Sequence, residues 1–266
     1  MKLCFRYFAG KSRLIPQIIN LMPPHRCYVE VFGGMGSVLL NKRPSKVEVY
    51  NDKYGDLVNF FICVKTDPQK LSMELDKLPY SRKVFLKLID DFKGKDIDDP
   101  FCLDYVRASH FFYLLHLGFA AHTPLDLNRG DFGYGTTRNR AVEFRKKIKT
   151  LNWAATRLSN VLIECFDFLD CLKRYDTSET LFYCDPPYIS TRNAGIPFGE
   201  NDHLNLCEAL KTVKGKWILT YGNHPLIQEW YKPYVIRFVD TSQSANLSHS
   251  LRNQNQHLII SNFKTL

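Results

Sequence analysis

Asp185 and Tyr188 are the residues whose types and spacing best suit chemistry on a bound molecule. They follow residues 181–184, a short apolar run that is typical of a buried central strand in a parallel sheet. Two prolines, Pro186 and Pro187, separate the pair. Because neither proline can donate to a strand ladder, the strand must end there, which puts Asp185 and Tyr188 on a rigid turn at its carboxyl end. Open α/β sheets bind their ligands at that edge.

The turn offers two hydrogen-bond acceptors and one flat ring. The carboxylate of Asp185 accepts a hydrogen bond from an amino group, and the carbonyl of Pro186, which no sheet uses, accepts a second. Stacking of a planar base on a ring such as Tyr188 contributes roughly 1–3 kcal/mol in nucleic-acid sites. Together these groups predict a pocket for the exocyclic amine of a nucleobase. Spacing alone leaves a second interpretation equally open, in which Asp185 only caps a strand-end turn.

A glycine-rich turn earlier in the chain has the composition of a cradle for a second ligand. Residues 27–32 form an apolar run, Gly33, Gly34 and Gly36 follow, and a helical pattern comes next. Glycines let the backbone approach a ligand closely and take positive φ. The third glycine of a dinucleotide fingerprint falls on Leu39, which disfavours a nicotinamide or flavin site. Taken singly, a Gly-x-Gly turn is more often plain strand-to-helix geometry.

Two further acids follow predicted strands. The run 47–50 is followed by Asn51 and then by Asp52. A carboxylate at that position can accept hydrogen bonds from both ribose hydroxyls of a nucleoside. The run 161–165 is followed by Asp167, which suits either the adenine of such a ligand or the cap of the next helix. The remaining strands are predicted at 216–221, 235–239 and 257–260, the last two as an antiparallel pair.

Composition sets outer limits on what the chain does. Its 266 residues fit one large α/β domain or a core domain with a smaller insert. The net charge of +9 favours a polyanionic partner, nucleic acid first, although a basic surface can be incidental. The cysteines form no Cys-x-x-Cys pair and the histidines show no metal-ligand spacing, which disfavours a metal site or a zinc deaminase. With no cleavable leader and no apolar run of ~18 residues, we expect a cytoplasmic protein with reduced thiols.

In combination, these signals resemble the adenine-specific DNA methyltransferases related to the Dam enzymes, in the order of their alpha group. Residues 185–188 are similar to the catalytic signature, and residues 30–36 to the loop that binds S-adenosylmethionine. The resemblance implies a Rossmann-like methyltransferase sheet with helices on both faces, built from residues 1–59 and 159–266. It assigns the cofactor to Tyr7, Lys11, Phe32, Gly34, Gly36, Asp52, Asp167, Phe168 and Asp185, and no metal.

Residues 60–158 interrupt this core, and the resemblance implies that they are an inserted, mainly helical target-recognition lobe. Apolar spacing predicts helices at 71–78, 84–92 and 101–117. A further helix is predicted at 138–158, and its basic residues either neutralise DNA phosphates or form an ordinary solvent-exposed face. The implied DNA-binding residues are Asn128, Arg129, Tyr134, Arg138 and Arg140. The family's Gly-Tyr-Asn-Gly segment is replaced by residues 118–122, so GATC is not assumed as the target.

The reaction implied by the resemblance is methyl transfer from S-adenosylmethionine to the exocyclic amine of adenine in duplex DNA. The base must be flipped out of the helix, with Asp185 and Pro186 holding the amine and Tyr188 stacking on the ring. Cytosine amino methylation and a non-catalytic DNA-binding module are the alternatives. The expected partner is double-stranded DNA, with no membrane. We expect a monomer or weak dimer, and a cognate restriction endonuclease or a phage life cycle stays open.

Overall fold

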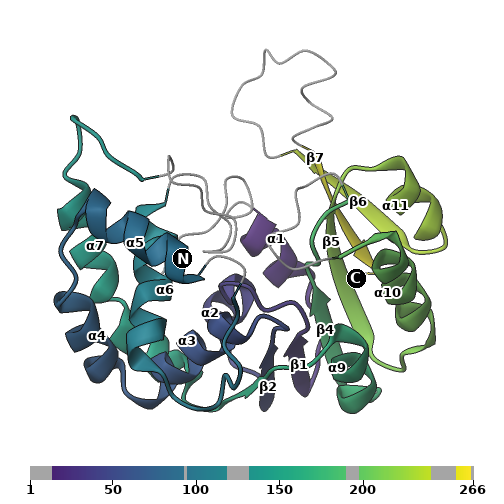
Figure 1. Ribbon diagram of the computed structural model, residues 1–266. Helices are drawn as coiled ribbons and strands as arrows, with labels where there is room; N and C mark the ends of the chain where they lie inside the picture. Colours follow the sequence, from purple (N-terminus) through teal and green to yellow (C-terminus); the bar gives the residue numbers. More distant parts are fainter. Residues whose placement is uncertain (1–13, 93–94, 119–131, 190–197, 241–255, 265–266) are drawn as a thin grey trace. The chain divides into compact units, whose positions relative to one another are not determined.

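The computed structural model describes residues 14–92, 95–118, 132–189, 198–240 and 256–264 (Figure 1). Its described residues divide into two compact units. The helical unit lies within Tyr54–Cys165, and the sheet unit comprises the described residues before Tyr54 and after Cys165. The predicted insert, 60–158, begins after the start of the helical unit and ends before its end. Its role in target recognition stays a prediction.

The sheet unit carries six strands and five helices. The strands are β1 (Cys27–Glu30), β2 (Val47–Asn51), β4 (Thr180–Cys184), β5 (Lys216–Gly222), β6 (Val235–Asp240) and β7 (Gln256–Ser261). The helices are α1 (Leu14–Leu21), α2 (Ser37–Asn41), α9 (Phe168–Tyr175), α10 (Glu200–Thr212) and α11 (Pro225–Trp230). With β3 (Val161–Glu164), the strands form a seven-stranded sheet in the order β3-β2-β1-β4-β5-β7-β6.

Strand direction fixes which ends of the strands meet. β1 runs parallel to β2 and to β4, and β4 runs parallel to β5. β7 lies antiparallel between β5 and β6, as predicted for the last two strands. The expected Rossmann-like architecture of a mixed sheet flanked by helices is confirmed. Each strand that the structure describes matches its predicted run to within one or two residues, because apolar residues predominate in it and polar or turn residues bound it.

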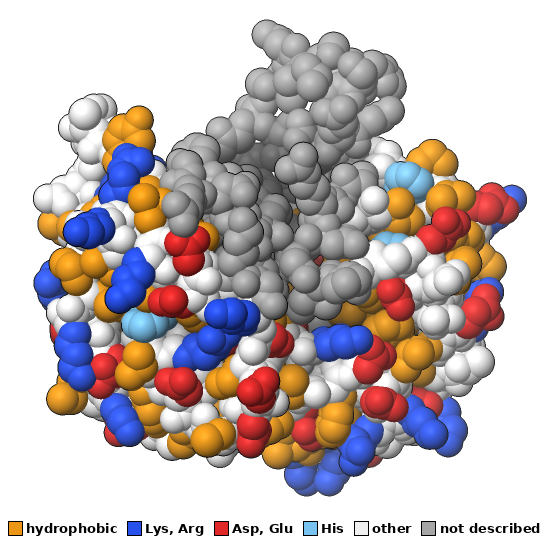
Figure 2. All heavy atoms as spheres, viewed as in Figure 1, with side chains coloured by type: hydrophobic (Ala, Val, Ile, Leu, Met, Phe, Trp, Pro, Cys, Tyr) orange, Lys and Arg blue, Asp and Glu red, His pale blue; other side chains and the backbone are white. Residues whose placement is uncertain are grey.

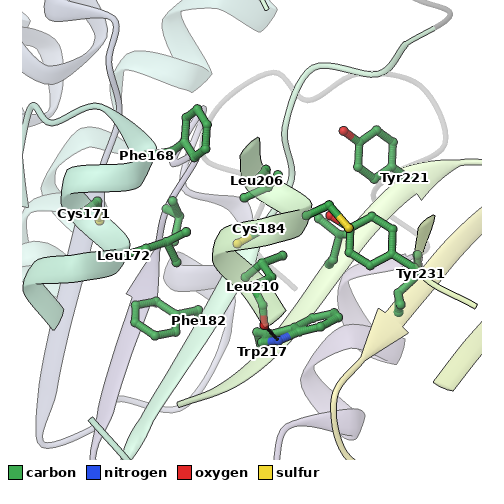
Figure 3. Packing of buried hydrophobic residues seen from close by; sticks show 14 of the residues in the cluster. Phe168, Cys171, Leu172, Phe182, Cys184, Leu206, Leu210, Trp217, Tyr221 and Tyr231 are labelled. Atoms are coloured by element: carbon green, nitrogen blue, oxygen red, sulfur yellow. Dashed lines mark hydrogen bonds between the residues drawn. The ribbon is translucent and has the colours of Figure 1, made fainter. Parts of the chain in front are cut away.

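The main core of the sheet unit lies between the strands and helices α9, α10 and α11 (Figure 3). All five residues of β4 are buried, which fits its place in the middle of the sheet. Trp217 of β5 is fully buried, and its indole Nε1 donates to the carbonyl of Leu210 at 2.9 Å, drawn as a dashed line in Figure 3. The buried polar atom is therefore satisfied, and the indole contributes its whole surface to packing.

The described residues of the helical unit form six helices: α3 (Gly55–Thr66), α4 (Pro68–Asp76), α5 (Arg82–Phe92), α6 (Tyr105–Leu117), α7 (Arg140–Ile148) and α8 (Leu151–Leu158). Its core is aromatic, with Phe60 stacked on Phe112 and in contact with Phe111. Buried Asp56 pairs with the guanidinium of Arg107, which joins α3 to α6. Of the helices that the structure describes, none is long and apolar enough to cross a bilayer.

Helix ends were predicted less well than strands. The helix expected at 101–117 begins at Tyr105, because the carboxylate of Asp104 accepts a hydrogen bond from the amide of Arg107 and caps it. The single helix expected at 138–158 is wrong, since the chain forms α7 and α8 instead. The amide and hydroxyl of Thr150 both donate to the carbonyl of Lys147, at 2.9 and 2.7 Å, and this tight turn ends α7.

Candidate active site

The residues singled out around Asp185 and the glycine turn follow strands whose carboxyl ends lie at one edge of the sheet. Glu30 of β1 is in register with Tyr50 of β2 on one side and with Tyr183 of β4 on the other. The glycine turn follows β1, Asp52 follows β2, and Asp185 follows β4. The structure therefore brings these segments together, as parallel strands require.

The glycine turn has a conformation that only small residues adopt. Gly34 and Gly36 have φ values of 48° and 63°, in the left-handed region. A Cβ at Gly33 would lie 2.3 Å from the ring of Tyr50. A Cβ at Gly34 would meet no described atom within 4 Å, so the turn opens to space at that residue. This is the shape of a cradle in which a ligand meets the main chain.

Asp52 holds the glycine turn in place. Its Oδ2 accepts a hydrogen bond from the amide of Gly34 at 2.8 Å, and the hydroxyl of Tyr50 donates to the carbonyl of Gly34 at 2.6 Å. The backbone N–H and the backbone carbonyl of Gly34 are thus both hydrogen-bonded to residues at the end of β2. The carboxylate of Asp52 lies beside the turn, where an acid that binds a ribose is expected.

Glu30 precedes the glycine turn, and its residue type alone did not predict a role. In the structure it is buried, and its carboxylate stabilises the turn. Glu30 is 2% exposed, and its carboxylate accepts hydrogen bonds from the amide of Leu39 at 2.7 Å and from the hydroxyl of Tyr28 at 2.8 Å. The N-cap of α2 is Gly36, which has no side chain to offer, so Glu30 supplies the missing acceptor from β1. Burial, reinforced by the charge of Asp185, raises the pKa of Glu30 to about 8.

Asn51 joins the end of β2 to the segment that precedes α9. Its amide nitrogen donates to the carbonyls of Val31 and Phe166, and its amide oxygen accepts from the backbone N–H of Phe166 at 2.9 Å. Asp167 caps α9 by accepting from Leu169 at 3.1 Å, and it also pairs with Lys53 at 3.0 Å. The structure thus gives Asp167 the capping role that the sequence left open, while its contact with a cofactor stays a prediction.

An aromatic cluster lies beside this segment. Phe168, the first residue of α9, stacks on Phe32 with ring centroids 5.5 Å apart. Phe198 packs edge-on against Phe32 at 5.6 Å. Of the two predicted aromatic contacts to a cofactor, Phe32 is partly exposed and Phe168 is buried. Phe32 therefore has the surface that a flat ligand ring needs, and Phe168 supports it.

The proline turn is held by β5. The hydroxyl of Thr220 donates to Oδ1 of Asp185 at 2.9 Å. The ring of Tyr188 stacks on Tyr221 with centroids 5.4 Å apart and an interplanar angle of 28°. A Cβ at Gly222 would lie 3.1 Å from the Tyr188 ring, so the absence of a side chain there permits the close approach. The two catalytic candidates are thus oriented by consecutive residues of one neighbouring strand.

The hydroxyl end of Tyr188 is also engaged. Its oxygen lies 3.4 Å from Nδ1 of His257 on β7. Burial raises the pKa of Tyr188 well above its usual value, and the charge of Asp185 and a hydrogen bond to it act in the same direction. The phenol is therefore neutral at physiological pH. Such a ring offers an uncharged, flat face for stacking.

The DNA-binding candidates that the structure describes lie in the helical unit. The side chain of Tyr134 is 71% exposed, and the guanidinium of Arg82 lies 5.1 Å from the centroids of both Tyr134 and Phe132. Arg138 is exposed, and half-buried Arg140 begins α7. Asn128 and Arg129, like the cofactor candidates Tyr7 and Lys11, lie outside the described residues.

The segment that carries Tyr134 is fastened at its base. The amide of Gly133 donates to the carbonyl of Leu117, and the hydroxyl of Tyr80 donates to the carbonyl of Gly133, both at 2.6 Å. Figure 2 shows Lys and Arg side chains interspersed with Asp and Glu on the face drawn, so the net charge alone does not locate a binding surface. Within the described ranges, no cluster of three or more His, Cys, Asp or Glu side chains is arranged to hold a metal ion.

Comparison with known proteins places this geometry in context. Residues 7–244 match a family model described as D12 class N6 adenine-specific DNA methyltransferase. The type II methyltransferase M1.LlaDCHI of Lactococcus lactis subsp. cremoris is 23% identical over 272 residues, which cover 97% of this chain and 94% of that protein. The DNA adenine methylase of Salmonella typhi is 27% identical over 268 residues, 96% and 92% of the two chains. The DNA adenine methylase of Vibrio cholerae is 28% identical over 232 residues, 82% and 80% of the two chains.

Proposed function

This chain belongs to the D12 class N6 adenine-specific DNA methyltransferase family, and on that premise we propose that it transfers a methyl group from S-adenosylmethionine to the exocyclic amine of adenine in duplex DNA. The observation that carries the proposal is the meeting of two turns at one edge of the sheet. One turn, after β1, presents open backbone at Gly34, and the other presents the carboxylate of Asp185 beside the ring of Tyr188.

The residues around the glycine turn suit S-adenosylmethionine. We propose that Gly34 and Gly36 approach its amino-acid portion, that Asp52 accepts hydrogen bonds from its ribose, and that Phe32 packs against its adenine with Asp167 nearby. The positive φ values of the turn and the space at Gly34 support this assignment. When bound, the cofactor supplies an activated methyl group on a sulfonium. Tyr7 and Lys11 stay predicted contacts of the same ligand.

The proline turn suits the amine that receives the methyl group. Asp185 and the carbonyl of Pro186 accept its two hydrogen bonds and so direct the nitrogen lone pair toward the methyl carbon. Tyr188 stacks on the base, which offsets part of the few kcal/mol that flipping it out of the duplex costs. Alignment of this kind supplies on the order of 7–11 kcal/mol of the barrier reduction. Electrostatic stabilisation by Asp185 acts on the positive charge that develops on the nitrogen.

We propose that the helical unit reads the DNA. Tyr134, Arg138 and Arg140 provide an exposed ring and positive charges, and Asn128 and Arg129 complete the predicted set. The last turn of α7, which carries Arg145, Lys146 and Lys147, would neutralise phosphates, and such contacts contribute affinity without sequence preference. A cytoplasmic location, a monomer or weak dimer, and a link to a restriction endonuclease or a phage stay predictions at the same level.

Expression in a methylation-free bacterial host tests the proposal. Single-molecule sequencing of the host DNA is expected to show N6-methyladenine at one recurring motif, and none in a host carrying an empty vector. Methylated cytosine instead would establish the alternative amino methylation. If the purified protein is folded and binds S-adenosylmethionine by calorimetry but modifies no base in host or purified DNA, the proposed transfer is wrong.

A further inference from the structure

Thr220 lies at the junction between the core of the sheet and the proline turn. It is 1% exposed and sits on β5, one residue after Leu219, which is in register with Cys184 of β4. Its hydroxyl oxygen lies 2.9 Å from Oδ1 of Asp185 and 3.1 Å from the hydroxyl of Tyr183. The carbonyl of Cys184 is farther away, at 3.4 Å. A single buried hydroxyl thus joins a buried phenol to the carboxylate of the turn.

The direction of these hydrogen bonds follows from counting protons. A threonine hydroxyl has one proton to donate, and an ionised carboxylate is the strongest acceptor within its reach. Burial raises the pKa of Tyr183 well above its usual value, with the charge of Asp185 as the next cause, so the phenol keeps its proton. Tyr183 therefore donates to Thr220, and Thr220 donates to Asp185.

We propose that Thr220 is a positioning residue for methyl transfer. Two successive hydrogen bonds, from Tyr183 to Thr220 and from Thr220 to Asp185, fix the orientation of the Asp185 carboxylate plane. This inference rests on the proposed function, because it assigns the carboxylate to the substrate amine. A carboxylate attached by a short side chain rotates about its Cβ–Cγ bond, and terminal torsions of this kind have broad minima. The bond from Thr220 narrows that freedom before the base arrives, which is the preorganisation that transfer to a weakly nucleophilic amine needs.

Three variants separate this role from a contribution to stability. Thr220→Val removes the hydroxyl but keeps the branched shape, and Thr220→Ser keeps the hydroxyl. Thr180→Val is the matched control, because Thr180 is also 1% exposed, lies at the opposite end of β4, and donates from its hydroxyl to the carbonyl of Tyr175 at 2.7 Å. Each purified protein is assayed with S-adenosylmethionine carrying a tritiated methyl group and with DNA from a methylation-free host.

We expect Thr220→Val to lower kcat about 10- to 100-fold, the effect of losing one hydrogen bond to a charged group, with KM for DNA and cofactor within about threefold of wild type. Thr220→Ser is expected to restore kcat to within about threefold of wild type, because it keeps a hydroxyl donor. Thr180→Val is expected to lower the melting temperature at least as much as Thr220→Val does, without the loss in kcat.

The outcomes distinguish this inference from the proposed function. If Thr220→Val retains wild-type kcat while the wild-type enzyme methylates DNA, the positioning role is wrong and the proposed function stands. An equal loss of kcat in Thr180→Val and Thr220→Val assigns the effect to stability and also overturns the role. If the wild-type protein binds S-adenosylmethionine and transfers no methyl group to any DNA, the proposed function itself has failed.

Discussion

The turns after β1 and after β4 lie at the same edge of the sheet but are built in opposite ways. The first is made of glycines, and its supports, Asp52 and Glu30, accept hydrogen bonds from backbone amides. The second is made of prolines, and its support from Thr220 acts on the side chain of Asp185. One turn therefore presents main chain to a ligand, and the other presents the side chains of Asp185 and Tyr188 together with the carbonyl of Pro186.

The difference teaches where each turn is vulnerable. At the glycine turn the backbone path is the functional feature, so an added carbon distorts the fold and the ligand site where it would meet neighbouring atoms, as at Gly33. At the proline turn the path is fixed by Pro186 and Pro187, and the functional groups are attached to it. Binding and chemistry are thus expected to respond to different substitutions, and the following changes test that separation.

The largest expected effect is on the proline turn. Asp185→Ala is expected to reduce methyl transfer by at least about 1,000-fold, because it removes both the acceptor of the amine and the charge that stabilises the transition state. Calorimetry should still detect cofactor binding. The control is Asp176→Ala, which removes a carboxylate that caps the amides of Lys214 and Gly215 away from the turn. Activity of Asp185→Ala near that of this control would contradict the catalytic assignment.

Substitutions in the glycine turn are expected to lower the stability of the folded protein. The Cβ of Gly33→Ala would lie 2.3 Å from the Tyr50 ring and 2.8 Å from the carbonyl oxygen of Asn51. We expect it to lower the free energy of unfolding by about 3 kcal/mol and to weaken cofactor binding, as overpacking does. Gly34→Ala meets no described atom and carries only the cost of its positive φ, roughly 1–2 kcal/mol. Urea unfolding of the two variants measures the difference, and equal losses would refute the steric explanation.

Glu30 makes the support of the glycine turn sensitive to pH. Its pKa rises from an ordinary 4.5 to about 8 in the folded chain, chiefly through burial. Because the folded state holds this proton more tightly than the unfolded state, the stability that it contributes is complete below about pH 4.5 and is lost as pH rises through about 8. Glu30→Gln removes the titration.

The free energy of unfolding of the wild type relative to Glu30→Gln should therefore fall between about pH 5 and about pH 8. Urea unfolding of both proteins across this range provides the measurement. Parallel pH profiles for the two proteins would show that Glu30 is ionised throughout the range, which would contradict the predicted shift.

The smallest effect concerns the cap of α9 and its ion pair. Lys53→Met breaks a pair in which the lysine side chain is 63% exposed, so we expect a loss of less than about 1 kcal/mol that disappears at high salt. Asp167→Ala also removes the cap, and should cost about 1 kcal/mol more. Thermal unfolding at low and high salt separates the two contributions. If both variants lose the same stability, the cap contributes nothing.

The success of the strand predictions and the weakness of the helix predictions have physical causes. A buried strand such as β4 is marked by consecutive apolar residues, and prolines end it locally. The start of α3 carries no such mark, because the amides of Gly55 and Asp56 are capped by the carboxylate of Asp96, which lies about forty residues away. A distant cap leaves no local pattern in the sequence, so the start of α3 at Gly55 was not predicted. The predicted insert, 60–158, therefore begins inside this helix.

The sequence by itself determined the residue types at each turn, the strands that lead into them, and the family to which their order belongs. The tertiary structure decided which groups support them. Thr220 is 35 residues from Asp185, and Glu30 reaches Leu39 across the glycine turn. These partners depend on strand register and side-chain direction, which are set by packing of the whole sheet and not by any neighbouring residue. For that reason the chemistry of the turns could be predicted, and the hydrogen bonds that orient them could not.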